Sequence, residues 1–349
     1  MENLCNLVYN PNSEKELIME LTNYKSSLNI FDTQRAIKFI KDEFIARLSE
    51  TLNLRRVTAP LFVYPETGLN DNLNGYERPV KFDVASLNKE VEIVQSLAKW
   101  KRYGLAKYSF PMHEGLYTDM NAIRRDEKVD FMHSVYVDQW DWEKVISEAD
   151  RNLDYLKDTV KGIYKCIKEV NSLVAKEFKI KNYDLPDDIY FISTKELENL
   201  YPTLTRKERE NKICSLYKAV FLYQIGWPLE DGASHDGRAA DYDDWNLNGD
   251  ILLWYDLYNI AFEISSMGIR VDKTSLIKQL TQKNELNKVN NEYCRWIMDD
   301  KIPQSIGGGI GQSRLCMYML GKAHIGEVQV SVWDKQEVEE LKKQNIYLL

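Results

Sequence analysis

The order of the segments predicts an α+β protein, with a mainly antiparallel β-sheet flanked by helices. Strand-like patterns come in consecutive runs, such as residues 80–84 with 91–94 and 251–254 with 260–264. A doubly wound parallel sheet would instead alternate strands with helices along the chain. The chain has 349 residues, of which 44% are hydrophobic, which is enough for a large core. We find no repeat or linker, and we expect a short extension over residues 1–30 and a single domain over residues 31–349.

Composition narrows the function. The net charge of −8 and the pI near 5.3 argue against a nucleic-acid-binding surface. The N-terminus shows no basic region followed by an apolar core, and no apolar run approaches the ~20 residues of a membrane span. The five cysteines are scattered without metal-site spacing, which is typical of reduced thiols in a cytosol. We therefore expect a cytoplasmic protein without nucleic-acid or membrane partners.

The first half of the chain begins with an amphipathic stretch near residues 14–24. A helix is then expected from Asp32 or Thr33, either of which can cap it, because apolar residues recur at three- and four-residue steps to Leu52. A strand follows over residues 54–58 and ends at Pro60. Further predicted elements are a loop at 66–76, strands at 80–84 and 91–94, a helix at 96–108, a hairpin with strands near 114–124 and 134–140, and a helical region at 141–180.

The second half is predicted to hold the main strand pair, and it closes with a glycine-rich segment. The expected strands are residues 188–193, 220–224, 251–254, 260–264 and 269–271, and the expected helices are residues 194–200, 273–285 and 292–298. Residues 231–245 form a glycine- and aspartate-rich loop. It can be either a solvated acidic loop or a lid over a phosphorylated ligand, and His235 can be an ordinary loop residue.

Residues 306–320 carry the densest local pattern. Gly307, Gly308, Gly309 and Gly311 precede a helical run that has Arg314 in its first turn. A glycine-rich turn that opens a helix can bind anions, and an arginine there suits a phosphate. The segment is neither a P-loop nor a dinucleotide-binding turn. For the turn alone, a packing role with a surface arginine is about equally compatible.

Charged residues on or beside predicted strands suggest a nucleotide site. Lys101, Arg124 and Arg314 suit phosphate oxygens, and Asp250 with Glu263 could hold Mg²⁺. The alternatives are surface ion pairs for the arginines and a turn role for Asp250 after Asn-Gly. Glu263 lies in an apolar strand, where a carboxylate requires a partner or a metal.

Several stretches together resemble the ammonia-dependent asparagine synthetases of the A type, the aspartate–ammonia ligases, over about residues 30–349. They are SLAKWKR (96–102), EGLYT (114–118), HSVYVDQWDW (133–142), DYDDW (241–245), LNGD (247–250), EISSMGIR (263–270) and IGGGIGQSRL (306–315). The resemblance implies the fold of a class II aminoacyl-tRNA synthetase catalytic domain. The helix and strand before Pro60, the hairpin with Arg124 and the segment with Arg314 look like that fold's three motifs, the first of which forms a homodimer.

The resemblance also implies a two-step reaction. ATP with Mg²⁺ would convert aspartate to β-aspartyl-adenylate, and ammonia would then give asparagine and AMP. By similarity, Arg124, Arg314, Lys101 and Asp71 would be catalytic. The residues expected to bind aspartate are Asp71, Lys101, Gln139, Asp141 and Ser266. The residues expected on the ATP side are Arg124, Asp243, Asp250, Glu263, Arg270 and Arg314, with Asp250 and Glu263 toward the metal.

Two other functions remain open, and the chain departs from the family pattern at two places. A paralogue could form an aminoacyl-adenylate for tRNA, or it could act as a non-catalytic amino-acid or nucleotide sensor. The extension is roughly 25 residues long relative to the bacterial family. The connection from Trp245 to Leu247 is short where the family leads us to expect a longer loop. Cys316 is expected to pack and not to react.

Overall fold

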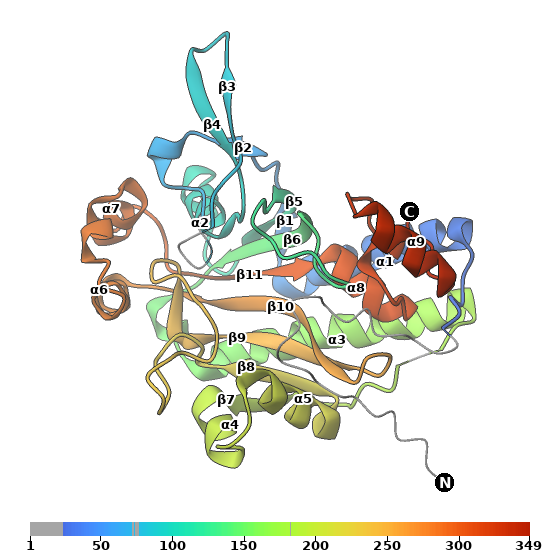
Figure 1. Ribbon diagram of the computed structural model, residues 1–349. Coiled ribbons are helices and arrows are strands. Elements are labelled where there is room, and N and C mark those ends of the chain that lie inside the picture. The colour runs from blue at the N-terminus through green and yellow to red at the C-terminus, as the bar shows by residue number, and fades with distance from the viewer. Residues whose placement is uncertain (1–23, 72, 74–76, 182) are drawn as a thin grey trace.

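The computed structural model describes residues 24–71, 73, 77–181 and 183–349, and an eight-stranded sheet forms its centre (Figure 1). The strand order is β1-β5-β6-β11-β10-β9-β8-β7. Their bounds are β1 Leu54–Arg56, β5 Gly115–Ile123, β6 Tyr136–Val145, β7 Tyr190–Ser193, β8 Ala219–Tyr223, β9 Asp243–Tyr255, β10 Ile260–Arg270 and β11 Ser305–Gly311. The pairs from β5 to β8 are antiparallel, and the two outer pairs, β1 with β5 and β7 with β8, are parallel. The predicted fold class is confirmed.

Helices α1, α3 and α8 pack on one face of this sheet (Figure 1). The bounds are α1 Ile30–Leu52, α3 Leu153–Phe178 and α8 Gln312–Leu320. The predicted apolar stripe of α1 is buried at Ile40, Phe44 and Leu48, against the same core as Trp140 and Trp142 of β6. Each such side chain contributes roughly 1.5–3 kcal/mol through removal from water, so the stripe holds α1 on the sheet.

The opposite face carries shorter elements, which surround the candidate site. Their bounds are α2 Ala98–Lys107, α6 Lys273–Gln282 and α7 Glu292–Met298, with a small sheet of β2 Phe62–Val63, β3 Lys81–Val84 and β4 Lys89–Ile93. Figure 1 shows the β3–β4 hairpin projecting from the body of the molecule. The remaining helices are α4 Thr194–Leu200, α5 Arg206–Tyr217 and α9 Lys335–Lys343, and short 3-10 helices occur at Pro65–Thr67, Glu148–Asp150, Leu286–Asn290 and Ile325–Glu327.

Several expected boundaries are wrong. Residues 141–145 belong to strand β6, and the helix expected from residue 141 begins only at Leu153, where Asn152 caps it. The alternation of Trp140 and Trp142 with polar residues fits the pleat of a strand paired on both sides, and that pairing overrides local helix preference. Helix α1 is capped by Asn29, whose side chain accepts from the Asp32 backbone N–H, and not by Asp32 or Thr33.

Other differences arise because β9 and β10 are longer than predicted. Residues 243–245 belong to β9 and not to the acidic loop, and the short connection from Trp245 to Leu247 is the interior of this strand. The strand expected at residues 269–271 is the end of β10. Helices α5 and α9 were not predicted.

The N-terminal segment falls largely outside the described residues, and so does Cys5. The part of the extension that is described includes Tyr24, which is buried and donates a hydrogen bond to Glu327. The other four cysteines are buried and free, as expected of reduced thiols. Among the described residues, we find no helix with the length and apolar character of a membrane span.

Candidate active site

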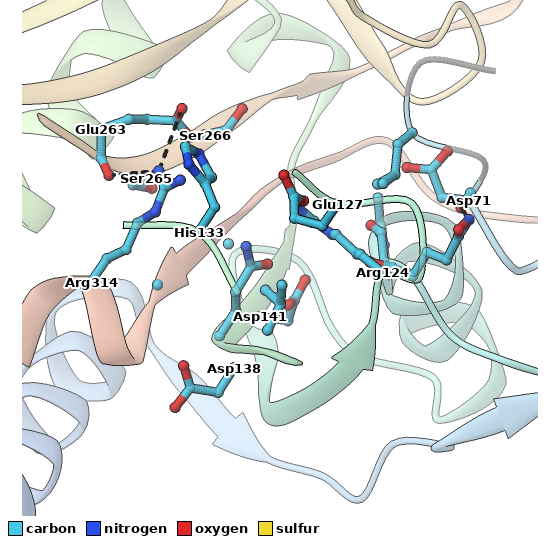
Figure 2. A pocket seen from close by; sticks show the side chains of 18 of the residues that line it. Asp71, Arg124, Glu127, His133, Asp138, Asp141, Glu263, Ser265, Ser266 and Arg314 are labelled. Atoms are coloured by element: carbon cyan, nitrogen blue, oxygen red, sulfur yellow. Dashed lines mark hydrogen bonds and ion pairs between the residues drawn. The ribbon is translucent and has the colours of Figure 1, made fainter. Parts of the chain in front are cut away.

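A cavity of about 420 Å³, here called the main cavity, opens over β6, β10 and β11 on the face away from α1 and α3 (Figure 2). The predicted site residues that line it are Asp71, Lys101, Arg124, Gln139, Asp141, Asp243, Glu263, Ser266, Arg270 and Arg314. Asp250 is the predicted residue that does not line it. The structure therefore brings together side chains from seven separate segments of the chain, and their roles are predictions.

Strand register explains why these residues meet. Gly307, Gly309 and Gly311 of β11 lie opposite Glu143, Asp141 and Gln139 of β6. Directly opposed residues of paired strands point to the same face. On the other side of β11, Gly309 lies opposite Ser266 of β10, and Ser266 in turn lies opposite Asp250 of β9. One face of four neighbouring strands thus carries the polar residues.

The glycine-rich segment is a strand and not the turn that the sequence predicted. Among the described glycines, positive φ occurs at Gly68, Gly226, Gly232 and Gly321, so the glycines of β11 do not use that freedom. They provide space instead. A Cβ on Gly307 would come closer than 3.0 Å to the Glu143 carboxylate, and one on Gly309 would come closer than 3.0 Å to the Gln139 amide.

Lys101 and Asp141 form an ion pair that lines the main cavity, and Asp71 lines the same cavity on the side of Arg124 (Figure 2). Lys101 Nζ lies 2.5 Å from Asp141 Oδ1 and donates to the Gly308 carbonyl at 2.7 Å. The Oδ2 atoms of Asp141 and Asp71 are buried and have no hydrogen-bond partner among the described residues. Burial raises the pKa of Asp71 from 3.8 to about 6, although Lys99 opposes this shift. Both free oxygens can accept hydrogen bonds from an ammonium group.

Arg124 and Arg314 approach the main cavity from different elements. Arg314 lies in the first turn of α8, and it donates to the Glu263 carbonyl at 3.1 Å and lies 3.8 Å from the Glu263 carboxylate. Arg124 follows β5, donates to the Gln95 carbonyl at 3.4 Å and lies 3.9 Å from Glu127. Figure 2 shows Arg124 beside Glu127 on the side of Asp71, with Arg314 beside Glu263 farther away. Neither arginine has a close ion pair, since the nearest carboxylates lie at 3.8 and 3.9 Å, so both guanidinium groups can still bind an anionic ligand.

Asp250 lies on the same face of the sheet but does not line the main cavity, and it is paired with Arg238. Its other oxygen, Oδ1, has no partner among the described residues. Burial raises the pKa of Asp250 to about 7, against the nearby Arg238 charge and with a contribution from the negative charge of Glu263. Within the described ranges, no group of three or more histidine, cysteine, aspartate and glutamate residues could hold a metal ion. Glu263 and Asp250 could supply at most two carboxylate ligands to Mg²⁺, so water and phosphate oxygens would complete its coordination shell.

The sequence reasoning missed Glu143, which is fully buried beside the main cavity. Its carboxylate accepts from Arg270 Nε at 2.9 Å and from Ser305 Oγ at 2.6 Å, while Arg270 also pairs with Asp243. Burial alone would raise the pKa of Glu143, but the Arg270 guanidinium outweighs it and lowers this pKa. Glu143 was missed because a helix was expected from residue 141. In a strand, alternate residues share a face, so Glu143 lies on the same face as Gln139 and Asp141.

The sheet order and the site on its face define a class II aminoacyl-tRNA synthetase type of catalytic domain. The asparaginyl-tRNA synthetase from Pyrococcus horikoshii complexed with asparaginyl-adenylate superposes with a TM-score of 0.61, at 16% identity over 85% of this chain and 68% of that chain. A putative aspartyl-tRNA synthetase from Leishmania major gives 0.59, at 14% identity over 88% of this chain and 66% of that chain. These similarities show the fold alone.

Sequence relatives define the family. The family model for aspartate-ammonia ligase matches residues 31–345. The aspartate–ammonia ligases of Lactiplantibacillus plantarum and Clostridium tetani are both 54% identical, over 89% and 93% of this chain and 97% and 96% of their own lengths, respectively. The chain belongs to the aspartate–ammonia ligase family.

Proposed function

We infer that this protein is an aspartate–ammonia ligase, a biosynthetic enzyme that uses ATP to join ammonia to the side-chain carboxylate of L-aspartate. The observation that carries the chemistry is that one cavity is lined by both kinds of group. Lys101, Asp71 and Asp141 suit the charged groups of an amino acid, and Arg124 and Arg314 suit phosphates.

We propose further that the reaction passes through β-aspartyl-adenylate. Arg124 would hold the α-phosphate and Arg314 the distal phosphates or the nucleotide, so that both stabilise negative charge during displacement of diphosphate. Lys101 would orient a carboxylate of aspartate, while Asp141, Gln139 and Ser266 would fix its other polar groups. Bound Mg²⁺ would neutralise phosphate charge, with Glu263 and Asp250 on its side.

The remaining partners follow from the family resemblance. We propose a cytoplasmic homodimer that forms through α1 and β1, the latter being an edge strand of the eight-stranded sheet. Light scattering coupled to size-exclusion chromatography would measure the mass, and a monomer at micromolar concentration would contradict the proposal. We propose no nucleic-acid partner, since the chain carries a net charge of −8.

The test of the function is a balanced assay with ATP, Mg²⁺, ammonium and aspartate labelled with ¹⁸O in the side-chain carboxylate. An adenylate route yields asparagine with AMP, and one ¹⁸O atom passes to the AMP phosphate. Release of ADP, with the label in inorganic phosphate, would contradict adenylate formation. Aspartate-dependent charging of tRNA would favour the synthetase alternative, and binding without turnover would favour the sensor.

A further inference from the structure

A second cavity of about 230 Å³ lies beside the main cavity. We call it the side cavity. Both cavities are lined by Asp71 and Leu73, so these residues form a common wall. The other walls come from the segment after β2, from β4, from α2, from the loop before β9 and from the segment after α6. The side cavity therefore adjoins the main cavity at Asp71, one of the residues expected to bind aspartate.

Among the described residues, four acidic and four basic side chains line the side cavity, and two ion pairs join four of them. Lys99 Nζ lies 2.7 Å from Asp241 Oδ2, and both side chains are almost fully buried. Lys288 and Glu285, which are more exposed, form a second pair, with 2.8 Å between Lys288 Nζ and Glu285 Oε2. Paired charges make the walls polar without a large net field, so a small polar molecule can pass without being trapped.

Asp71 differs from these wall residues. Its side chain is 1% exposed, and its Oδ2 atom has no hydrogen-bond partner among the residues that the structure describes. An unpaired buried acceptor is costly, so a donor from a ligand is expected at this oxygen. Its pKa of about 6, raised by burial, leaves the carboxylate ionised at neutral pH and thus attractive to a small cation.

Bound aspartate and ATP are expected to fill much of the main cavity, which leaves little space for ammonium to enter beside them. At about 420 Å³ it falls within the size range that encloses most of a drug-sized ligand, and an acyl-adenylate is such a ligand. The nucleophile must then reach the acyl carbon from a side that the nucleotide leaves open. The side cavity meets the main cavity at Asp71, on the side of Arg124 and away from Arg314 (Figure 2).

We propose that the side cavity is the path by which ammonium reaches the main cavity, and that Asp71 in the common wall binds it on the way. This inference rests on the proposed ligase function. Ammonium is compact and donates hydrogen bonds in four directions, so it matches a small polar cavity that ends at a carboxylate. Ammonium becomes the nucleophile only when it gives up a proton, which the ionised Asp71 carboxylate can accept. The path separates delivery of this ammonium from delivery of ATP and aspartate.

The first test narrows the side cavity. Ala239 is part of its lining, and its backbone carbonyl, which accepts from Trp245, is retained on substitution. Ala239→Phe should raise the KM for ammonium roughly tenfold or more, and it should leave aspartate-dependent diphosphate–ATP exchange, measured without ammonium, within about twofold. The matched control is Ala233→Phe, which changes an exposed alanine of the same loop outside the side cavity.

A second, milder test changes only charge. Glu285→Gln leaves the Lys288 charge unpaired at the side cavity, so the KM for ammonium should rise about two- to threefold at low ionic strength and recover in salt. Glu339→Gln is the control, because Glu339 forms an equivalent ion pair with Lys342 on α9, at 2.7 Å and also three residues apart.

The outcomes distinguish failure of the ammonium path from failure of the ligase function. An unchanged KM for ammonium in both side-cavity variants would overturn the path, and so would a parallel loss of diphosphate–ATP exchange, which would make the cavity part of the adenylation site. Failure of the ligase function looks different, since the unmodified protein would then form no asparagine at any ammonium concentration.

Discussion

Replacement of Asp71 by asparagine should stabilise the protein at neutral pH while it abolishes asparagine formation. The carboxylate is buried, and one of its oxygens has no partner among the described residues. Burial raises its pKa from 3.8 to about 6, and Asp241 adds to this effect, whereas Lys99 opposes it. The ionised carboxylate is thus less favourable in the folded chain than in water, and asparagine removes the charge with little change of shape.

The magnitude follows from the difference between the two pKa values. A difference of about 2 pH units corresponds to about 3 kcal/mol, at about 1.36 kcal/mol per unit. The pKa of Asp71 is higher in the folded protein, so the folded state binds more protons between about pH 4 and pH 6. Stability of the unmodified protein therefore falls as the pH rises through that window. The advantage of Asp71→Asn should grow from near zero at about pH 4 to about 3 kcal/mol above about pH 6.

The assay is urea unfolding without substrates, followed by tryptophan fluorescence and far-UV circular dichroism, at about pH 7.5 and about pH 4.5. Asp83→Asn, at an exposed position of β3, serves as the control and should show no comparable pH-dependent gain. An equal gain for Asp71→Asn at both pH values, or a loss at about pH 7.5, would refute the argument that an uncompensated buried charge is the cause.

Three further substitutions test the arrangement of the site. Glu143→Gln leaves the buried Arg270 charge without its main counterion, and it should cost about 3–5 kcal/mol; an unchanged melting temperature would show that Arg270 finds compensation elsewhere. Gly309→Ala places a Cβ against the Gln139 amide, and it should raise the KM for aspartate roughly tenfold, whereas normal kinetics would mean that Gln139 adjusts freely. Arg314→Ala should suppress diphosphate–ATP exchange about 100-fold with an unaltered circular dichroism spectrum, and retained exchange would remove Arg314 from the reaction.

Much of the fold could be predicted from local patterns. The apolar spacing of α1 is buried as expected, and most predicted strands and several helices occur close to the predicted positions. The residues taken from the family motifs also meet in one cavity, except for Asp250. Local spacing succeeds here because each element buries one continuous apolar face, which leaves a periodic trace in the sequence.

The failures share a physical cause. Glu143 acts on Arg270 through a contact across 127 residues of sequence, and Arg238 acts on Asp250 through a contact between a loop and the following strand. The sequence does not show which residue a charged side chain will pair with, so a residue of a buried ion pair cannot be distinguished from a solvent-exposed charge. The helix expected from Asp141 failed for a related reason: pairing with β5 and β11 determines the strand, and those partners lie elsewhere in the chain.

The glycines of β11 show how a correct feature can receive the wrong interpretation. Gly307, Gly309 and Gly311 alternate along the strand, and a Cβ at each would meet the side chain of Glu143, Gln139 or Arg314, respectively. Gly308 faces the other way, where a Cβ would meet Met267 of the core. At Gly307, Gly309 and Gly311, β11 therefore carries no side chains, and side chains from neighbouring elements lie directly against its backbone. Glycines at alternate positions fit a strand whose face is covered by side chains of other residues. An anion-binding turn would instead require positive φ or free N–H groups at irregular positions.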